Sequence, residues 1–277
     1  MITRRDFLKV TGVAAAAAAL TACGGSSSTA SSAASSTAAS SEAASTSAAA
    51  AELTTVEAGK LTMATNAAFP PYEMTTDAGE FEGIDIDTAK AIAEKLGLEL
   101  QIDDMDFDAA LLSVQQGKAD IVMAGVTVTD ERKAVMDFSD SYATGIQSII
   151  VPEGSDIASP DDLAGKKIGT QRGTTGYIYC SDDFGDDAVV AYDDGLTAVQ
   201  ALNNGQVDAV VIDNAPAKEF VAANPGLVIL DTSYAEEDYA IGLAKGSALE
   251  DAVNAALEEL KADGTLQSIV DKYITAE

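Results

Sequence analysis

The sequence predicts an α/β fold of two similar lobes, each a mainly parallel sheet flanked by helices. Two observations predict it. Short apolar segments of strand character alternate with helical segments over residues 61–124, an order typical of βαβ units. Residues 111–125 then align with residues 199–213, so a helix that ends at glycine and the apolar strand after it occur twice.

The first unit is recognisable element by element. Residues 61–65 and 98–102 have the composition of strands. Between them, we expect Asp87 to cap a helix that ends at Gly97. Its apolar residues recur at helical spacing at Ala89, Ile92, Ala93 and Leu96. A second predicted helix covers residues 109–116, and residues 119–124 form the next strand.

The repeat indicates where a ligand would bind. Asp120 aligns with Asp208, and both precede their strands, so we expect turn or capping roles for them. In open parallel sheets, ligands bind outside the carboxyl ends of the strands. Those ends are residues 124–127 in the first lobe and 212–214 in the second. Two lobes whose strand ends face each other would close on a ligand about a hinge.

The composition excludes several classes of function. The 277 residues include no histidine, which rules out Ser-His-Asp catalysis and His-ligated metal sites. Two cysteines cannot form a disulfide framework, and Cys180 is expected to be a buried apolar residue. A net charge of −29 argues against nucleic acid as a partner. The acidic runs at 103–106 and 182–183 lack the spacing of a calcium loop, so no cofactor or metal is predicted.

The N-terminal residues predict export and a lipid anchor. Residues 1–22 combine a basic start with an apolar run too short to span a bilayer. Arg4 and Arg5 lie in a segment that resembles the twin-arginine export motif, although an ordinary signal with two basic residues is the alternative. Leu20-Thr21-Ala22-Cys23 resembles a lipobox, which predicts lipidation of Cys23. Residues 23–54 would then be the lipidated cysteine and a flexible Ser/Ala linker, with the folded part held extracytoplasmically at the cell membrane.

Residues 59–277 resemble the extracytoplasmic amino-acid-binding proteins of ABC importers, the family 3 solute-binding proteins. The matching segments occur in the family's order: A-T-N-A-A-F-P-P-Y-E (64–73), G-I-D-I-D-T-A-K-A-I-A-E-K-L (83–96), A-G-V-T-V-T-D-E-R-K (124–133), D-F-S-D-S-Y (137–142), G-T-Q-R-G-T-T-G (169–176), V-D-A-V-V-I-D (207–213) and A-D-G-T (262–265). Thr88 departs from the family, which usually has an apolar residue there. The resemblance implies a two-lobed periplasmic-binding-protein fold of type II with two hinge crossings. Lobe one would be residues 55–144 plus 239–277, and lobe two residues 145–238.

The resemblance also implies a role for each site residue. Arg132 would hold the ligand α-carboxylate, since a guanidinium grips a carboxylate with two parallel hydrogen bonds. Asp213 would bind the ligand ammonium. The remaining ligand-binding residues would be Thr127 and Thr175 at the carboxylate, Thr174 in the same Gly-rich turn as Thr175, a carbonyl of Ala124 or Gly125 at the ammonium, the aromatic walls Phe69 and Phe107, and Asn66 and Gln171 at the ligand side chain.

The function implied is capture of an L-amino acid for delivery to an ABC permease and its separate ATPase, by a monomer that is not an enzyme. Some family members that bind cationic amino acids carry an acidic residue at the position of Asn66. The neutral Asn66 therefore favours a polar, uncharged ligand. Two alternatives stay open: a ligand-sensing receptor subunit, and a dehydratase of the cyclohexadienyl type on the same fold.

Overall fold

The structure, a computed structural model, describes residues 53–274, so the export signal and Cys23 lie outside the described residues. Its first sheet, the centre of lobe one, has the strand order β5-β1-β6-β14-β7. These strands are β1 (Lys60–Thr65), β5 (Glu99–Asp104), β6 (Ile121–Val122), β7 (Met136–Phe138) and β14 (Gly242–Ala244). A small antiparallel sheet of β2 (Ala68–Phe69), β3 (Glu73–Thr75) and β4 (Phe81–Glu82) follows β1 in the chain.

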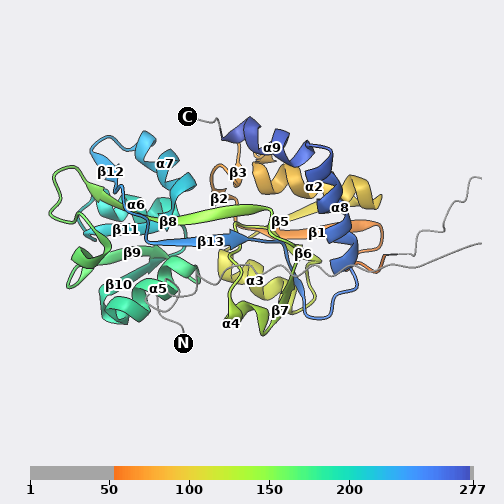
Figure 1. Cartoon of the computed structure of the whole chain (residues 1–277), viewed down its shortest axis with the longest axis horizontal. Coiled ribbons are helices and arrows are strands. Elements are labelled where there is room, and N and C mark those ends of the chain that lie inside the picture. The colour runs from red at the N-terminus through yellow and green to blue at the C-terminus, as the bar shows by residue number, and fades with distance from the viewer. Residues whose placement is uncertain (1–52, 275–277) are drawn as a thin grey trace, which may run out of the picture. The chain divides into compact units, whose positions relative to one another are not determined.

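Helices cover both faces of this first sheet. Figure 1 shows α2 (Ile84–Leu96), α8 (Glu250–Ala262) and α9 (Thr265–Tyr273) grouped on one face, with α3 (Phe107–Gln115) on the other. Helix α2 does not begin at Asp87 as predicted. Its N-terminal cap is Gly83, where the backbone has φ 133° and a Cβ would lie 2.1 Å from the Tyr72 carbonyl oxygen. Asp87 instead accepts hydrogen bonds from Lys272 and Tyr273 and so ties α2 to α9.

Lobe two contains the second sheet, in the order β10-β9-β11-β8-β12, with β13 also paired to β8. Its strands are β8 (Ala143–Pro152), β9 (Ile168–Gln171), β10 (Val189–Tyr192), β11 (Ala209–Asp213), β12 (Leu227–Ile229) and β13 (Ala235–Tyr239). Successive side chains of β11 point to opposite faces of the second sheet. Val210 packs in one apolar cluster with α6 (Gly195–Asn203) and α7 (Asn214–Ala223), whereas Val211 packs with Cys180 of α5 (Thr175–Phe184). Burial raises the pKa of the Cys180 thiol to about 12.

The predicted two-lobed α/β fold is confirmed, but the sheets are mixed. Strands β5, β1 and β6 run parallel, as do β10, β9 and β11, whereas the other pairs in these two sheets are antiparallel. Part of the antiparallel pairing comes from the two connections between the lobes. Strand β8 pairs with β13 from Ala143↔Tyr239 to Gln147↔Ala235, so the two connections form one antiparallel ribbon. Strands β8 and β13 run through the predicted lobe boundaries at residues 144/145 and 238/239 without a break, so these boundaries stay a prediction.

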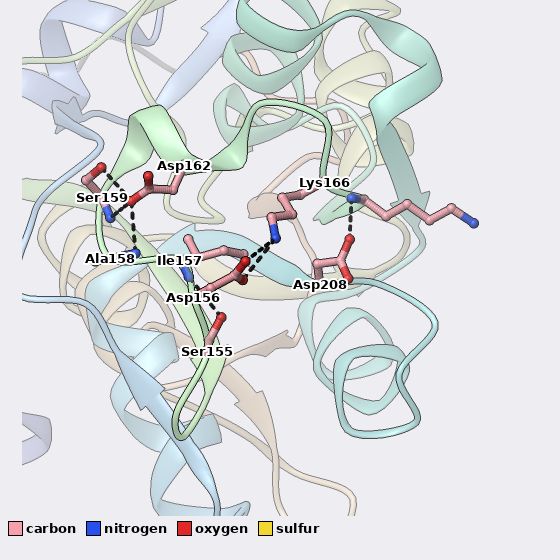
Figure 2. A network of polar contacts seen from close by, with 9 residues as sticks. Ser155, Asp156, Ile157, Ala158, Ser159, Asp162, Lys166 and Asp208 are labelled. Carbon is pink, nitrogen blue, oxygen red and sulfur yellow. Dashed lines mark hydrogen bonds and ion pairs between the residues drawn. The ribbon is translucent and has the colours of Figure 1, made fainter.

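The repeat predicted from the sequence is present in the backbone. Gly117 and Gly205 follow α3 and α6 with φ of 66° and 67°. Asp120 accepts a hydrogen bond from the Thr62 N–H at 2.8 Å, and Asp208 accepts one from the Lys167 N–H at 2.7 Å. Figure 2 shows Asp208 beside the turn of residues 155–166, which Asp162 and the Asp156–Lys166 ion pair stabilise. Each aspartate therefore binds the N–H of a neighbouring segment far along the chain, and the predicted turn or capping role is not what these bonds show.

Within residues 53–274, no helix is both long enough and apolar enough to cross a bilayer.

Candidate ligand-binding site

A pocket lies where the carboxyl ends of β1 and β6 in lobe one meet those of β9 and β11 in lobe two. Its lining contains every ligand-binding residue predicted from the sequence: Asn66, Phe69, Phe107, Ala124, Gly125, Thr127, Arg132, Gln171, Thr174, Thr175 and Asp213. Four further residues line it: Glu73, Gln147, Val211 and Ile212. Segments more than 100 residues apart in the chain thus share one cavity.

Arg132 is a buried residue of the pocket lining that several contacts hold in place. It lies in the short helix α4 (Asp130–Lys133), whose N-cap Thr129 accepts a hydrogen bond from the Arg132 N–H. Its guanidinium donates from Nη1 to the Thr127 carbonyl at 2.7 Å and from Nη2 to the Gly173 carbonyl of lobe two at 3.1 Å. The guanidinium also lies 5.4 Å from the centre of the Phe107 ring. Burial lowers the pKa of Arg132.

Hydroxyl groups from the two lobes approach each other beside Arg132. Thr174 caps α5 by accepting a hydrogen bond from the Tyr177 N–H, which places Thr175 at the first position of the helix. The Thr175 hydroxyl lies 3.5 Å from the Thr127 hydroxyl. A helix N-terminus with free N–H groups, two hydroxyls and a guanidinium is suited to binding a carboxylate.

Asp213 lies on the lobe-two side of the pocket. It occupies the N-cap position of α7, yet its side chain makes no capping hydrogen bond. The carboxylate instead accepts hydrogen bonds from Gln147 Nε2 at 2.7 Å and from the Tyr239 hydroxyl. Burial and the nearby charge of Glu237 raise the pKa of Asp213 to about 7. A buried carboxylate that is held this way is suited to binding an ammonium group.

The apolar part of the pocket belongs to lobe one. Phe69 and Phe107 are both buried and line the cavity. Gly125 has φ 55°, and a Cβ there would lie 2.9 Å from the Phe69 ring. Glycine therefore lets the aromatic wall pack directly against the backbone at the end of the lobe-one sheet.

An amide pair connects the two lobes in the pocket lining. Gln171 Nε2 donates to Asn66 Oδ1 at 2.8 Å, and Asn66 Nδ2 donates to the Met105 carbonyl at 3.0 Å. Arg172 points away from the pocket, because its half-exposed side chain forms an ion pair with Asp193.

Three buried polar residues of the site were missed by reasoning from the sequence. Gln147 Nε2 donates to both Asp213 and Glu237, and Glu237 also accepts from the Thr127 hydroxyl at 3.0 Å. Glu73 lines the pocket and is fully buried, and its side chain forms a hydrogen bond with that of Asp85, with its pKa raised well above the ordinary value by burial. A signal existed for Glu73, which ends the family segment at residues 64–73. None existed for Glu237, which lies in an acidic run whose alternate residues are exposed.

Comparison with known proteins identifies the family. The profile described as "Bacterial extracellular solute-binding proteins, family 3" matches residues 61–276. The chain belongs to this family. The profile of the twin-arginine translocation pathway signal sequence matches residues 1–21, which confirms the predicted export signal. This family 3 binding protein is therefore exported and extracytoplasmic. Its partners are an amino-acid ligand and an ABC transporter. Its relatives are transport proteins and not enzymes.

Its relatives bind several amino acids. The L-cystine-binding protein TcyJ of Escherichia coli K12 is 33% identical over 226 residues, covering 80% of this chain and 85% of TcyJ. The arginine-binding extracellular protein ArtP of Bacillus subtilis 168 is 33% identical over 230 residues, covering 79% of this chain and 87% of ArtP. Among solved structures, an ancestral arginine-binding protein bound to glutamine is 43% identical with a TM-score of 0.75, covering 79% of this chain and 99% of that protein.

Within residues 53–274, no group of three or more carboxylates and thiols is arranged to hold a metal ion.

Proposed function

We propose that this protein is a monomeric, lipid-anchored receptor that traps an L-amino acid between its two lobes and delivers it to an ABC permease driven by a separate ATPase. One observation carries the proposal. The buried cation Arg132 of lobe one and the buried carboxylate Asp213 of lobe two line the same pocket. A free amino acid carries the two complementary charges.

Each predicted site residue has a role in this proposal. Arg132 would bind the ligand α-carboxylate together with Thr127, Thr174 and Thr175, and Asp213 would bind the ammonium together with a carbonyl of Ala124 or Gly125. Phe69 and Phe107 would pack against the side chain, whose end would reach Asn66 and Gln171. Since neither lobe holds both charges, the ligand stabilises the closed form over the open one. The antiparallel ribbon of β8 and β13 is the natural hinge.

The relatives narrow the choice of ligand. TcyJ and ArtP are named for binding cystine and arginine, a further relative from Neisseria gonorrhoeae is named a probable histidine-binding protein, and an ancestral arginine-binding protein was solved with glutamine and with arginine. A thermal-shift screen of the purified mature protein against the twenty L-amino acids, cystine and ornithine tests the proposal. One compound or a small related group should raise the melting temperature, because a ligand that binds only the folded state stabilises it by mass action. If none does so at millimolar concentration, the proposed function is wrong.

The lipid anchor and the monomeric state are proposed on separate grounds. Cys23 directly follows the apolar run of the signal and is preceded by Leu20-Thr21-Ala22. Substitution Cys23→Ala should move the protein from the membrane fraction to the soluble extracytoplasmic fraction, measured by immunoblotting of fractionated cells. A Cys180→Ala variant is the matched control and should stay with the membrane. Equal membrane retention of both variants would contradict lipidation.

Sedimentation of the mature protein should give a single species of monomer mass.

A further inference from the structure

Two buried carboxylates lie close together at the pocket, one in its lining and one outside it. Asp213 ends β11 and lines the pocket, whereas Glu237 of β13 is not part of the lining. Two ionised carboxylates at close range disfavour each other's charge, and one of the pair then keeps a proton. The proposed function requires Asp213 to be ionised. The group that separates the two charges therefore decides whether an ammonium can bind there.

Gln147 lies between these two carboxylates. It belongs to β8, and it pairs directly with Asp213 in β11 on one side and with Ala235 in β13 on the other. Glu237 follows Ala235 by two residues and therefore lies on the same face of the sheet. Gln147 Nε2 donates to Asp213 Oδ2 at 2.7 Å and to Glu237 Oε2 at 3.0 Å. Both hydrogens of the amide nitrogen are thus used, one on each carboxylate.

The amide of Gln147 has only one favourable orientation. Turning it over would place its oxygen against both carboxylates, where three acceptors would meet without a proton between them. The oxygen Oε1 instead lies beside Gly176 of α5, where an added Cβ would come within 2.9 Å of it. The side chain as a whole is 1% exposed. Two carboxylates on one side and a glycine on the other therefore hold the amide in place.

This arrangement leaves Asp213 able to bind a cation. Its Oδ2 accepts from Gln147 and its Oδ1 from the Tyr239 hydroxyl, so each oxygen keeps a further lone pair. Glu237 is engaged within the protein instead, because its Oε2 also accepts from the Thr127 hydroxyl at 3.0 Å. Of the two carboxylates, only the one that lines the pocket has acceptor sites directed to a ligand.

The other titratable groups around this pair do not replace Gln147. Burial raises the pKa of four of them and keeps them protonated: Tyr72, Glu73, Tyr239 and, hydrogen-bonded to Glu237, Tyr179. Arg132 is the only buried lysine or arginine in residues 53–274, and the proposed function uses it for the ligand carboxylate. Burial and the charge of Glu237 raise the pKa of Asp213 to about 7, whereas the hydrogen bonds from Tyr239 and Gln147 lower it.

We propose that Gln147 is a positioning residue of the ammonium subsite, whose amide nitrogen holds the Asp213 carboxylate in place and separates it from the Glu237 carboxylate. Asp213 then meets the ligand ammonium in its charged form. Because Gln147 lies on the ribbon of β8 and β13, the subsite is attached to the connection between the lobes. This inference rests on the proposed function and adds a residue to the same site.

Carbon-13 NMR of the side-chain carboxyl groups between pH 5 and 9, on the unliganded mature protein, tests the inference. The Asp213 signal is the one that Asp213→Asn removes. Its titration midpoint should lie near pH 7 in the unmutated protein. In Gln147→Met it should rise by at least about one pH unit, because methionine has a similar length but no N–H. The double variant Gln147→Met/Glu237→Gln should reverse most of this rise, since the second carboxylate is then absent.

Gln171→Met is the matched control, because it makes the same change in the pocket lining. Within residues 53–274, the Gln171 amide nitrogen donates only to Asn66 and to the Asp193 carbonyl, so this variant should leave the Asp213 midpoint in place. A similar rise in both variants, an unchanged midpoint in Gln147→Met, or no recovery in the double variant would overturn the inference. Thermal unfolding reports whether each variant folds. Glu237→Gln alone keeps Gln147 and should lower the midpoint, which tests the pair independently.

Calorimetry with L-arginine and L-glutamine connects the midpoint to binding. Relative to the unmutated protein, Gln147→Met should lose at least about fivefold more affinity at pH 6.5 than at pH 8.5, the effect of a one-unit rise in the Asp213 pKa. Gln171→Met should lose affinity equally at both pH values. An equal loss at both in Gln147→Met would overturn the inference and leave the proposed function intact, whereas binding of no amino acid in the thermal-shift screen would overturn the proposed function.

Discussion

Strand β6 of lobe one and strand β11 of lobe two begin with the same arrangement of backbone and aspartate. Asp120 donates its N–H to the Thr62 carbonyl and accepts the Thr62 N–H, and Asp208 makes the same two bonds with Lys167. Where the strands end, the aligned residues are Gly125 and Asp213. One copy presents bare backbone against an aromatic ring, and the other presents a carboxylate.

This difference separates the parts of the molecule that build the fold from the parts that would bind the ligand. The beginning of each strand fixes the register to its neighbour, and that requirement is the same in both lobes. The end of each strand lies at the pocket, where the lobes meet opposite ends of the proposed zwitterion. Substitutions at strand ends should therefore change affinity, and substitutions at strand beginnings should change stability.

The largest effect is expected at Arg132, next to the end of the lobe-one sheet. Arg132→Ala should weaken ligand binding by at least about 2–3 kcal/mol, since it removes a charged bidentate contact. Titration calorimetry measures the loss. Arg132→Lys is the matched control, and it should recover only part of the affinity because an ammonium cannot make two parallel hydrogen bonds. Wild-type affinity in the alanine variant would remove Arg132 from the site.

On the lobe-two side, Asp213→Asn should weaken binding by about 2 kcal/mol, because a neutral amide replaces the carboxylate that would accept the ligand ammonium. Calorimetry against the same ligand measures this loss. The substitution should leave the free energy of unfolding unchanged or raised, since the carboxylate is buried at a cost. A variant that loses stability and affinity together would indicate a structural role for Asp213.

Affinity and stability should depend on pH in opposite directions. Asp213 must be ionised to bind an ammonium, and its pKa is about 7. Affinity should then fall by up to about 1.4 kcal/mol for each pH unit below 7. The unliganded protein behaves differently because burial raises the pKa of Asp213 to about 7 and of Asp85 to about 6, against an ordinary value of 3.8. Between pH 4 and 7 the native state binds more protons than the unfolded state, so the free energy of unfolding falls as pH rises.

Calorimetry and urea unfolding at pH 5, 6, 7 and 8 measure the two trends. Asp213→Asn serves as the control, since it should flatten the pH dependence of affinity and reduce that of stability. Parallel trends in the unmutated protein would contradict the role given to the buried carboxylates.

The sequence predicts the repeated features well and the site only partly. Alternating strands and helices and the glycines after α3 and α6 depend on local chemistry, so a single sequence reveals them. The start of α2 was misplaced because Gly83 caps it through a contact with Tyr72, which is a tertiary effect.

The burial of Glu237 was also not predictable from the sequence. It depends on the pairing of β13 with β8, which brings Glu237 next to Gln147 from a segment 90 residues away. Burial of a charged residue in an acidic run is decided by its strand partners and not by its neighbours in the chain.

The smallest effects are expected at the strand beginnings. Asp120 is buried and accepts the N–H groups of both Val56 and Thr62, so Asp120→Asn should lower the free energy of unfolding by about 2 kcal/mol. Asp208 is exposed, and among residues 53–274 its carboxylate accepts a hydrogen bond only from Lys167, so Asp208→Asn should cost about 0.5 kcal/mol. Urea unfolding measures both, and neither variant should change the ligand affinity. A loss of affinity in either one would show that the strand beginnings also shape the pocket, and the separation between the two ends of the strands would then be wrong.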